Sequence, residues 1–235
     1  MIDFNTFSLN TRTKNALSCL HIDFAFQPVF RAKTGELYAY EALMQPADMS
    51  FTELLNIYRK RRELHIIELA SLFGATQAYY DRGYEVPFFV NSFPSEVLLP
   101  EESESFYKAF PESVNQKMIV EIIEYPEIIY MNWNFKKKQI LEKGIKIALD
   151  NYGAGYNDIT TVHIIEPNII KLDKYMTDGI HKNTNAQYYF KKAIETFHAE
   201  NIQVLAKGIE TKEDYEYICS TDVDLVQGFY LGRPE

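Results

Sequence analysis

The stretch KIALDNYGAGYND, residues 146–158, begins with an apolar run that ends in an acid, Asp150. An amide, Asn151, follows the acid, and a turn with two glycines, Gly153 and Gly155, comes next. An apolar run of this kind is typical of a strand that is buried on both faces of a parallel sheet. A carboxylate directly after such a strand is well placed to meet a ligand. The stretch therefore predicts an α/β protein with its site at the strand ends.

Further short apolar segments alternate with longer helix-like segments on both sides of this stretch. The predicted strands cover residues 23–30, 36–44, 86–91, 117–123, 145–150, 167–173, 202–208 and 223–232. The first two are separated by a turn at 32–35 and read as an antiparallel hairpin. The pattern predicts a TIM-like (β/α)8 barrel with one antiparallel strand. We expect a lead-in segment at 1–22 and the barrel domain at 23–235.

Helix boundaries are signalled by capping residues. Ser50 or Thr52 is expected to cap a helical region that ends at Gly83, and Thr211 to cap a helix near the C-terminus.

The composition excludes several classes of protein. The net charge of -9 argues against nucleic-acid binding, which depends on clustered Lys and Arg. The basic clusters at 59–62 and 136–138 read as solvated helix faces. Two distant cysteines and five histidines without metal spacing do not predict a disulfide framework or a zinc site. Since neither a signal peptide nor a long apolar run occurs, we expect a cytoplasmic protein.

Polar side chains occur at nearly every predicted strand end. They are Glu41, Asn91, Glu121 with Glu124, Asp150 with Asn151, Lys171 with Asp173, Lys207 with Glu210, and Gln227. In a barrel the carboxyl ends of the strands meet at one face, where chemistry takes place. Glu41, Asn91, Glu121 and Asp150 form an all-oxygen set, which suits Mg²⁺ or Mn²⁺.

Seven ordered segments carry a family resemblance. They are FQPVFRAKTGELYAYEALM (26–44), FVNSFPSEVL (89–98), IVEIIE (119–124), ALDNYGAGYNDI (148–159), PNIIKLDKYM (167–176), VLAKGIET (204–211) and QGFYLGRP (227–234). Together they resemble EAL domains, the cyclic-di-GMP phosphodiesterases, and they include the Glu41-Ala42-Leu43 motif of the name.

The resemblance implies a site as well as a fold. EAL domains are barrels that commonly dimerise and use two Mg²⁺ or Mn²⁺ ions to open one phosphodiester of cyclic-di-GMP, which gives linear pGpG. By position, the implied metal ligands are Glu41, Asn91, Glu121 and Asp150, and the implied catalytic residues are Lys171, Glu41 and Gln227. The implied ligand contacts are Gln27, Gln45, Lys171 and Lys207. The loop that joins metal binding to the dimer would involve Glu124, Asn151, Gly153 and Gly155.

Three positions depart from the family pattern. Asn151 replaces a second aspartate, Lys207 replaces a glutamate, and Gln45 replaces an arginine that grips a substrate phosphate. An amide brings no charge to a metal site, and Gln45 cannot form a bidentate, charge-assisted clamp. Because the Lys207 ammonium would occupy the second-metal position, we expect at most one Mg²⁺ or Mn²⁺ ion, or none.

Several functions remain open from the sequence. One is a degenerate EAL domain of cyclic-di-GMP signalling with lost or very weak phosphodiesterase activity. Such a domain would bind a protein partner or sense cyclic-di-GMP, and we expect a homodimer. The alternatives are an active metal-dependent phosphodiesterase and a structural dimerisation module. The sequence also leaves open whether the chain is a whole protein or a domain of a longer one.

Overall fold

The computed structural model describes residues 2–110, 116–123, 129–155 and 157–235. Its strands close into a barrel in chain order, from β1 through β8 and back to β1. The strands are β1 (Ile22–Arg31), β2 (Leu37–Pro46), β3 (Phe88–Ser92), β4 (Met118–Ile122), β5 (Lys146–Tyr152), β6 (Ile169–Leu172), β7 (Gln203–Ala206) and β8 (Leu225–Val226). The predicted TIM-like barrel is confirmed.

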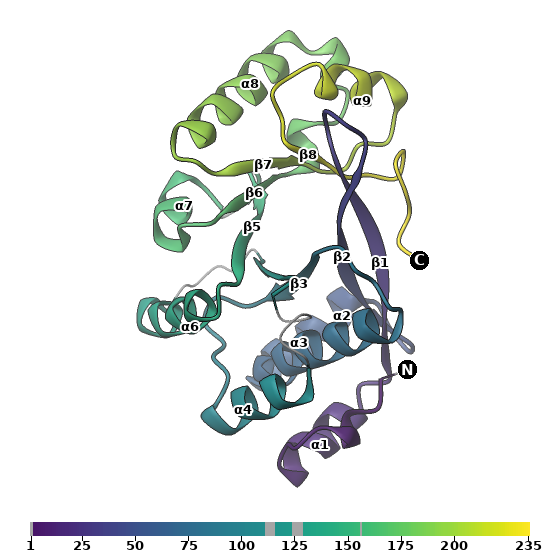
Figure 1. Cartoon of the computed structure of the whole chain (residues 1–235), viewed down its shortest axis with the longest axis vertical. Helices are drawn as coiled ribbons and strands as arrows, with labels where there is room; N and C mark the ends of the chain where they lie inside the picture. The colour runs from purple at the N-terminus through teal and green to yellow at the C-terminus, as the bar shows by residue number, and fades with distance from the viewer. Residues whose placement is uncertain (1, 111–115, 124–128, 156) are drawn as a thin grey trace.

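β1 is the antiparallel member of the barrel. It pairs antiparallel with β2 on one side and with β8 on the other, while all other neighbours pair in parallel. The turn after Arg31 closes the hairpin that the sequence predicted. Both chain ends lie beside β1 (Figure 1): the Ile2 amide donates to the Ile22 carbonyl, and Phe26 exchanges backbone hydrogen bonds with Glu235.

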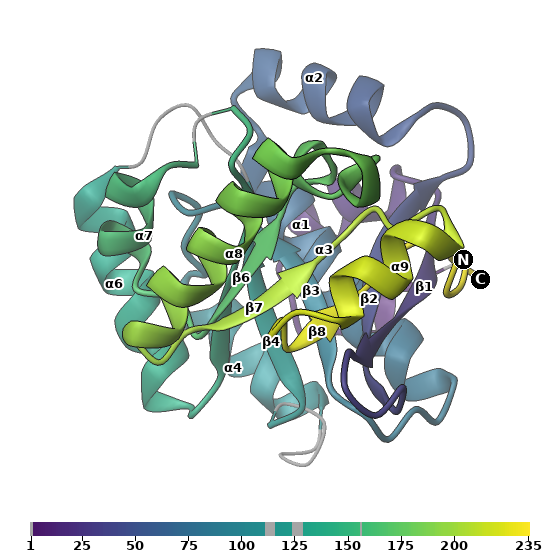
Figure 2. The same cartoon turned by 90° about the horizontal axis from the view of Figure 1, so that it is seen from above.

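Helices surround the barrel (Figure 2). They are α1 (Thr11–Ser18), α2 (Phe51–Arg61), α3 (Leu64–Asp81), α4 (Pro100–Ala109), α6 (Tyr130–Glu142), α7 (Ile159–Ile165), α8 (Thr184–Ala199) and α9 (Lys212–Cys219), with 3-10 turns η1 (Phe4–Thr6), η2 (Lys174–Met176) and η3 (Ile180–Lys182). Ser50 caps α2 in a reciprocal capping box with Glu53, and Thr211 caps α9. Within the described residues, none of the helices has the length and apolarity that crossing a membrane requires.

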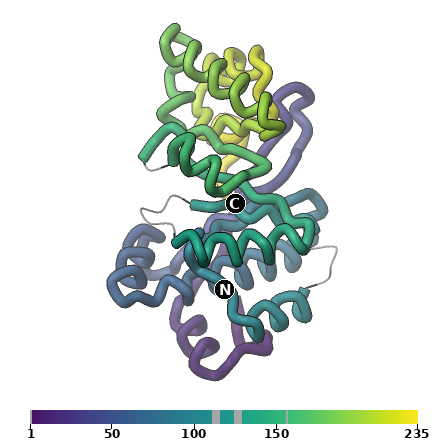
Figure 3. Tube along the Cα trace, turned by 90° about the vertical axis from the view of Figure 1, so that its left-hand side faces the viewer, coloured from purple at the N-terminus to yellow at the C-terminus, as the bar shows by residue number. Residues whose placement is uncertain are grey.

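The segment before β1 packs into the domain. Phe4, Phe7 and Leu17 are buried, and the Phe7 ring meets the Phe73 ring of α3 edge-on at 4.8 Å between centroids. The expected lead-in segment, residues 1–22, therefore shares one hydrophobic core with the barrel domain. Figure 3 shows how the chain is divided in space, with the N-terminal helices at one end of the molecule and α8 and α9 at the other.

A layer of apolar side chains fills the inside of the barrel. Each strand contributes at least one: Val29, Tyr38 and Ala39, Phe89, Ile119, Ala148, Ile169, Leu205 and Leu225. Side chains alternate between the two faces of a strand, so the intervening residues pack outward against the helices. The barrel is consequently closed by packing, and only its open end can hold a ligand.

A buried ion pair fixes the end of β3 to two helices. The Lys136 ammonium on α6 lies 2.6 Å from the Glu68 carboxylate on α3, and both side chains are buried. Glu68 also accepts hydrogen bonds from the Ser92 hydroxyl and the Phe93 amide, at 2.7 and 2.8 Å. Lys136 in addition donates to the Phe93 carbonyl. The interpretation of residues 136–138 as a solvated face was thus wrong for Lys136, because α6 turns this side chain toward the Glu68 carboxylate.

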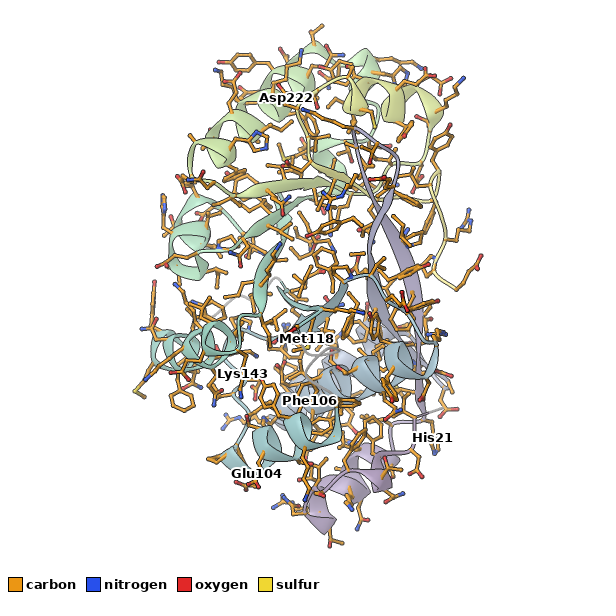
Figure 4. The ribbon with its side chains drawn as sticks, viewed as in Figure 1. His21, Glu104, Phe106, Met118, Lys143 and Asp222 are labelled. Atoms are coloured by element: carbon orange, nitrogen blue, oxygen red, sulfur yellow. The ribbon has the colours of Figure 1, made fainter. Side chains whose placement is uncertain are left out.

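The surroundings of this pair are densely packed. Figure 4 shows Phe106 of α4 and Met118 of β4 in the interior of the same half of the molecule, and both line a small cavity beside Glu68 and Lys136. Water has little access there, so each charge depends on the other.

We expect Lys136→Met to lower the free energy of unfolding by about 3–5 kcal/mol, because Glu68 would remain buried without its cation. Urea denaturation measures this change. The double variant Glu68→Leu/Lys136→Met should recover a large part of the loss. Lys138→Met, which removes an exposed partner of Glu142, should change the value by less than about 0.5 kcal/mol. The single variant Glu68→Leu completes the comparison. If the double variant lost as much free energy of unfolding as Glu68→Leu and Lys136→Met lose together, the pairing would be contradicted.

Candidate functional site

One polar residue from each strand forms a ring above the apolar layer. On β2 to β8 each ring residue comes two positions after a residue of the layer. On β3 to β8 it lies near, or directly beyond, the carboxyl end of the strand, whereas Glu41 lies in the middle of the longer β2. β1 runs the other way, so its ring residue comes two positions before Val29, and Gln27 pairs in register with Glu41. The ring consists of Gln27, Glu41, Asn91, Glu121, Asp150, Lys171, Lys207 and Gln227.

Lys171 holds the centre of the ring. Its ammonium lies 2.7 and 2.8 Å from the two oxygens of Glu121 and 2.8 Å from Glu41. Lys171 and Glu121 are fully buried. Three strands, β6, β4 and β2, are therefore joined across the barrel by one cation.

Lys207 forms a second pair at the edge of the ring. Its ammonium donates to Asp150 at 2.7 Å and also to the Asn151 side-chain oxygen. Asn151 can reach it because its backbone is in the left-handed region, with φ of 53°, which asparagine tolerates better than most residues. The Asn157 amide donates to the Asp150 carbonyl at 2.6 Å and fixes the backbone there.

The pKa values of these groups follow from burial and charge. Burial and the neighbouring Glu41 carboxylate raise the pKa of Glu121, against the effect of Lys171. Burial would also raise the pKa of Asp150, but the Lys171 and Lys207 ammonium groups outweigh it and hold the pKa below the usual range. Burial opposes a charged Lys171, yet the three carboxylates around it raise its pKa. Both lysines are thus the counter-ions of this site.

The remaining ring residues, Gln27, Asn91 and Gln227, are held by hydrogen bonds to neighbouring groups. The Gln227 amide donates to Glu41 at 2.6 Å, and the Gln27 amide donates to the Gly232 carbonyl at 3.0 Å. Asn91 is held through its backbone, where the Ser71 hydroxyl donates to its carbonyl at 2.6 Å. Only glycine fits after Gln227, because a Cβ on Gly228 would meet the backbone of Ile209 at 2.0 Å.

The other predicted site residues lie outside the ring. Gln45 is exposed, and its amide donates to the Leu43 carbonyl at 3.4 Å. Gly153 and Gly155 have φ of 92° and 62°, and a Cβ on Gly153 would meet the Met176 sulfur of η2 at 2.5 Å. Glu124 lies outside the described residues. The structure therefore brings together the predicted metal and catalytic positions, while Gln45 lies outside the ring and lines a hollow beside Glu41 and Asn91.

Two hollows open on either side of Glu41 and Leu43. The larger has a volume of about 650 Å³ and reaches from Asn91 and Asp150 to α2, where Phe51 and Leu55 line it. The smaller, about 250 Å³, is lined by Lys174, Lys207 and Phe229 among others. An elongated ligand could lie across the ring with one end in each hollow.

Comparison with known families identifies this architecture. The model of the EAL domain matches residues 11–234, which is nearly the whole chain. The chain belongs to the EAL-domain family. The assignment agrees with the resemblance drawn from the seven sequence segments.

Curated relatives of this EAL domain include signalling proteins of different kinds. It is 25% identical over 211 residues to the blue light- and temperature-regulated antirepressor BluF of Escherichia coli, covering 87% of this chain and 52% of that protein. It is 23% identical over 177 residues to the probable cyclic di-GMP phosphodiesterase PdeD of the same organism, covering 74% of this chain and 30% of the relative. The chain thus spans about half or less of these relatives' length.

Solved EAL structures share the fold. A standalone EAL protein of Vibrio cholerae, in a form bound to c-di-GMP, superposes with a TM-score of 0.79 at 22% identity, covering 91% of this chain and 92% of that one. A manganese and c-di-GMP complex of Klebsiella pneumoniae BlrP1 gives the same TM-score and identity, covering 91% of this chain and 56% of the other. At this identity the likeness supports the barrel and nothing finer.

Sequence reasoning missed the residues that support the ring of this EAL domain. Glu68, Ser71 and Lys136 hold the end of β3 on which Asn91 lies. One signal was available: apart from Asp81 at its end, Glu68 is the one acid in the largely apolar sequence of α3, which predicts a buried, paired carboxylate. No comparable signal marked Lys136, because its neighbours Lys137 and Lys138 are also cationic.

A divalent metal ion requires oxygen ligands whose lone pairs are free to coordinate it. Each ring carboxylate already bonds to an ammonium group: Glu41 and Glu121 to Lys171, and Asp150 to Lys207. Among the described residues, no three His, Cys, Asp or Glu side chains are arranged to hold a metal ion. The residues present do not fit a pair of divalent cations.

We expect Lys171→Met to lower the free energy of unfolding by about 3–5 kcal/mol, since Glu121 and Glu41 would lose their shared cation in a buried site. Urea denaturation at neutral pH measures the change. Lys174→Met is the matched control, because Lys174 pairs with Glu210 where both are exposed, and its loss should stay below about 1 kcal/mol. Equal losses in the two variants would show that Lys171 is not the central counter-ion.

Proposed function

We propose that this chain is a non-hydrolysing EAL domain that acts in cyclic-di-GMP signalling by binding a protein partner. The observation that carries the proposal is the Lys207 ammonium, bonded to both Asp150 and Asn151. These are the two positions where the family pattern has adjacent aspartates. A tethered cation thus occupies the space that a second metal ion would need.

The charge of the ring supports the same conclusion. Three carboxylates and two ammonium groups leave a formal charge of -1, against the four positive charges of two divalent ions. At the short distances within the ring, an ammonium group repels a dication by several kcal/mol even at an intermediate dielectric constant. The Lys207 ammonium, which stands where the family pattern has a glutamate, therefore opposes metal entry as well as occupying ligand atoms.

The loss of the metal pair would remove the largest source of catalysis. Two-metal sites stabilise the attacking and leaving oxygens of a phosphodiester together. Lys171 could still orient a polar group, and Gln227 could still donate a hydrogen bond. Neither generates a hydroxide nucleophile at neutral pH, so we derive no hydrolytic step from this ring.

A role in protein binding has support from the relatives. One curated relative, 25% identical to this chain, is named an antirepressor, a word that describes action on another protein. A family member that does not hydrolyse its nucleotide can still transmit a signal through its surface. We therefore propose that this chain acts by binding a protein partner.

A second candidate is sensing of cyclic-di-GMP without hydrolysis. The two hollows beside Glu41 favour it, since both open next to the ring and share Glu41 and Leu43 in their linings. Gln45 weighs against tight binding, because a neutral amide lacks the charge of a phosphate clamp.

The decisive experiment restores the missing acids. The double variant Lys207→Glu/Asn151→Asp should bind Mn²⁺ at least about tenfold more tightly than the wild type, and it should gain metal-dependent hydrolysis of cyclic-di-GMP. Calorimetry measures metal affinity, and chromatography of the product measures hydrolysis. Lys182→Glu/Asn185→Asp makes the same change in charge on exposed residues and should leave both unchanged. Wild-type turnover at an ordinary enzymatic rate of about 1 per second or more would refute the proposal.

Titration of the wild type with cyclic-di-GMP separates the two candidates. If the chain senses the nucleotide, heat should appear with and without Mg²⁺, because binding would rest on the ring and the hollows alone. If it acts only through a protein partner, neither titration should give heat. Heat that requires Mg²⁺ would contradict both candidates and favour a working metal site.

A further inference from the structure

A groove along α2 lies next to the run of four cations, residues 59–62, at the C-terminal end of this helix. It is lined by residues from the end of α1, the end of β2 and the outer face of α2, and its volume is about 230 Å³. Leu20, Pro46, Met49, Ile57 and Tyr58 make most of its surface apolar. We call this feature the α2 groove.

The α2 groove is separate from the ring. Ile57, Tyr58 and Arg61 line the groove, whereas Phe51 and Leu55 line the larger hollow of the site. At 3.6 residues per turn, Leu54, Ile57 and Arg61 lie on one face of α2, and Thr52 and Leu55 lie on the neighbouring face, with Phe51 and Tyr58 between them. Figure 2 shows α2 at the periphery of the molecule, outside the barrel.

Four consecutive cations, Arg59 to Arg62, end α2 beside the groove, and all are exposed. Lys60, Arg61 and Arg62 make no ion pair with any residue that the structure describes. Cations do stabilise the C-terminal end of a helix dipole, but that effect falls off within the last turn and amounts to at most about 1 kcal/mol for an exposed residue. The dipole does not account for a run of four in a chain whose net charge is -9.

Two acids lie close to the run: Asp48 lines the groove, and Glu63 directly follows Arg62 and, like Arg61, acts electrostatically on Tyr58. Neither forms an ion pair with Lys60, Arg61 or Arg62 among the described residues. Asp48 lies 3.3 Å from the His21 imidazole, and Figure 4 places His21 at the start of β1 beside α1. Arg61 lies over the Tyr58 ring, 5.8 Å from its centroid, so its charge is held next to the apolar floor. The groove thus combines an apolar floor with the Arg61 cation in its lining, and Lys60 and Arg62 adjoin Arg61 in the chain.

We propose that the α2 groove docks an acidic segment of a partner protein, with apolar side chains of that segment in the groove and its carboxylates on Lys60, Arg61 and Arg62. The volume is below the roughly 300–1,000 Å³ of small-molecule sites and suits side-chain anchors. Four cations on a strongly acidic protein are too few to hold a nucleic acid, which requires a broad basic surface. This inference rests on the proposed partner-binding function and names the surface and chemistry of the contact.

The test uses fluorescently labelled acidic peptides with Leu, Phe or Trp anchors and fluorescence anisotropy with the full chain. At least one peptide should bind with a dissociation constant below about 100 µM, or about -5.5 kcal/mol. Its counterpart with Gln in place of every acid should bind at least tenfold more weakly. Raising the salt concentration should weaken the binding of the acidic peptide and leave the binding of its Gln counterpart unchanged.

Variants assign the binding to the groove. Lys60→Glu/Arg61→Glu/Arg62→Glu should weaken binding at least tenfold, and Met49→Ser should weaken it through the apolar floor. The control Lys182→Glu/Lys191→Glu/Lys192→Glu makes an equal charge change near α8, at the other end of the molecule, and should have little effect. Thermal unfolding of each variant shows that it remains folded.

Several results would overturn the inference. They are absence of binding by every acidic peptide, equal binding of the Gln counterparts, and equal weakening by the two triple variants. Tighter binding of duplex DNA or phosphatidylserine vesicles through the same cations would also overturn it. Hydrolysis of cyclic-di-GMP by the wild type is a separate outcome, which would remove the proposed function and leave the peptide result standing.

Discussion

The Lys171 ammonium group is the interaction on which the site depends. It is fully buried, bonds to both oxygens of Glu121 and to Glu41, and so joins three strands across the open end of the barrel. A buried cation is tolerated only where carboxylates surround it, and buried carboxylates need a cation in return. The positions of Glu41 and Glu121 and the protonation states of the ring all follow from this mutual dependence.

The ring is also supported from below and from the side. The apolar layer beneath it excludes water and fixes which side chains can point into the opening. The Glu68–Lys136 pair holds the end of β3, and the Ser71 hydroxyl holds the Asn91 carbonyl, so the amide of Asn91 faces the ring from a fixed backbone. The position of the ring residue Asn91 therefore depends on buried polar contacts that α3 and α6 make with the end of β3.

Lys207 explains the amide that follows Asp150. Asn151 donates no charge but offers an oxygen to the lysine, and its left-handed backbone brings that oxygen into reach. The Asn151 side-chain oxygen accepts a hydrogen bond from the Lys207 ammonium. The two departures from the family pattern are therefore chemically consistent with each other. The proposed function rests on that pairing, and the proposed docking of an acidic segment in the α2 groove would give the domain a surface through which to act.

The sequence by itself determined the barrel, the hairpin that opens it, the family and the identity of the strand-end residues. It could do so because apolar runs, capping residues and turn glycines are local signals, and because side chains alternate along a strand with a fixed period. Only the tertiary structure decided which lysine bonds to which acid, that Gln45 lines the larger hollow outside the ring, and that Lys136 is buried against Glu68. These outcomes depend on strand register and on how helices pack against the barrel, which join residues far apart in the chain. No local pattern in the sequence encodes those distances.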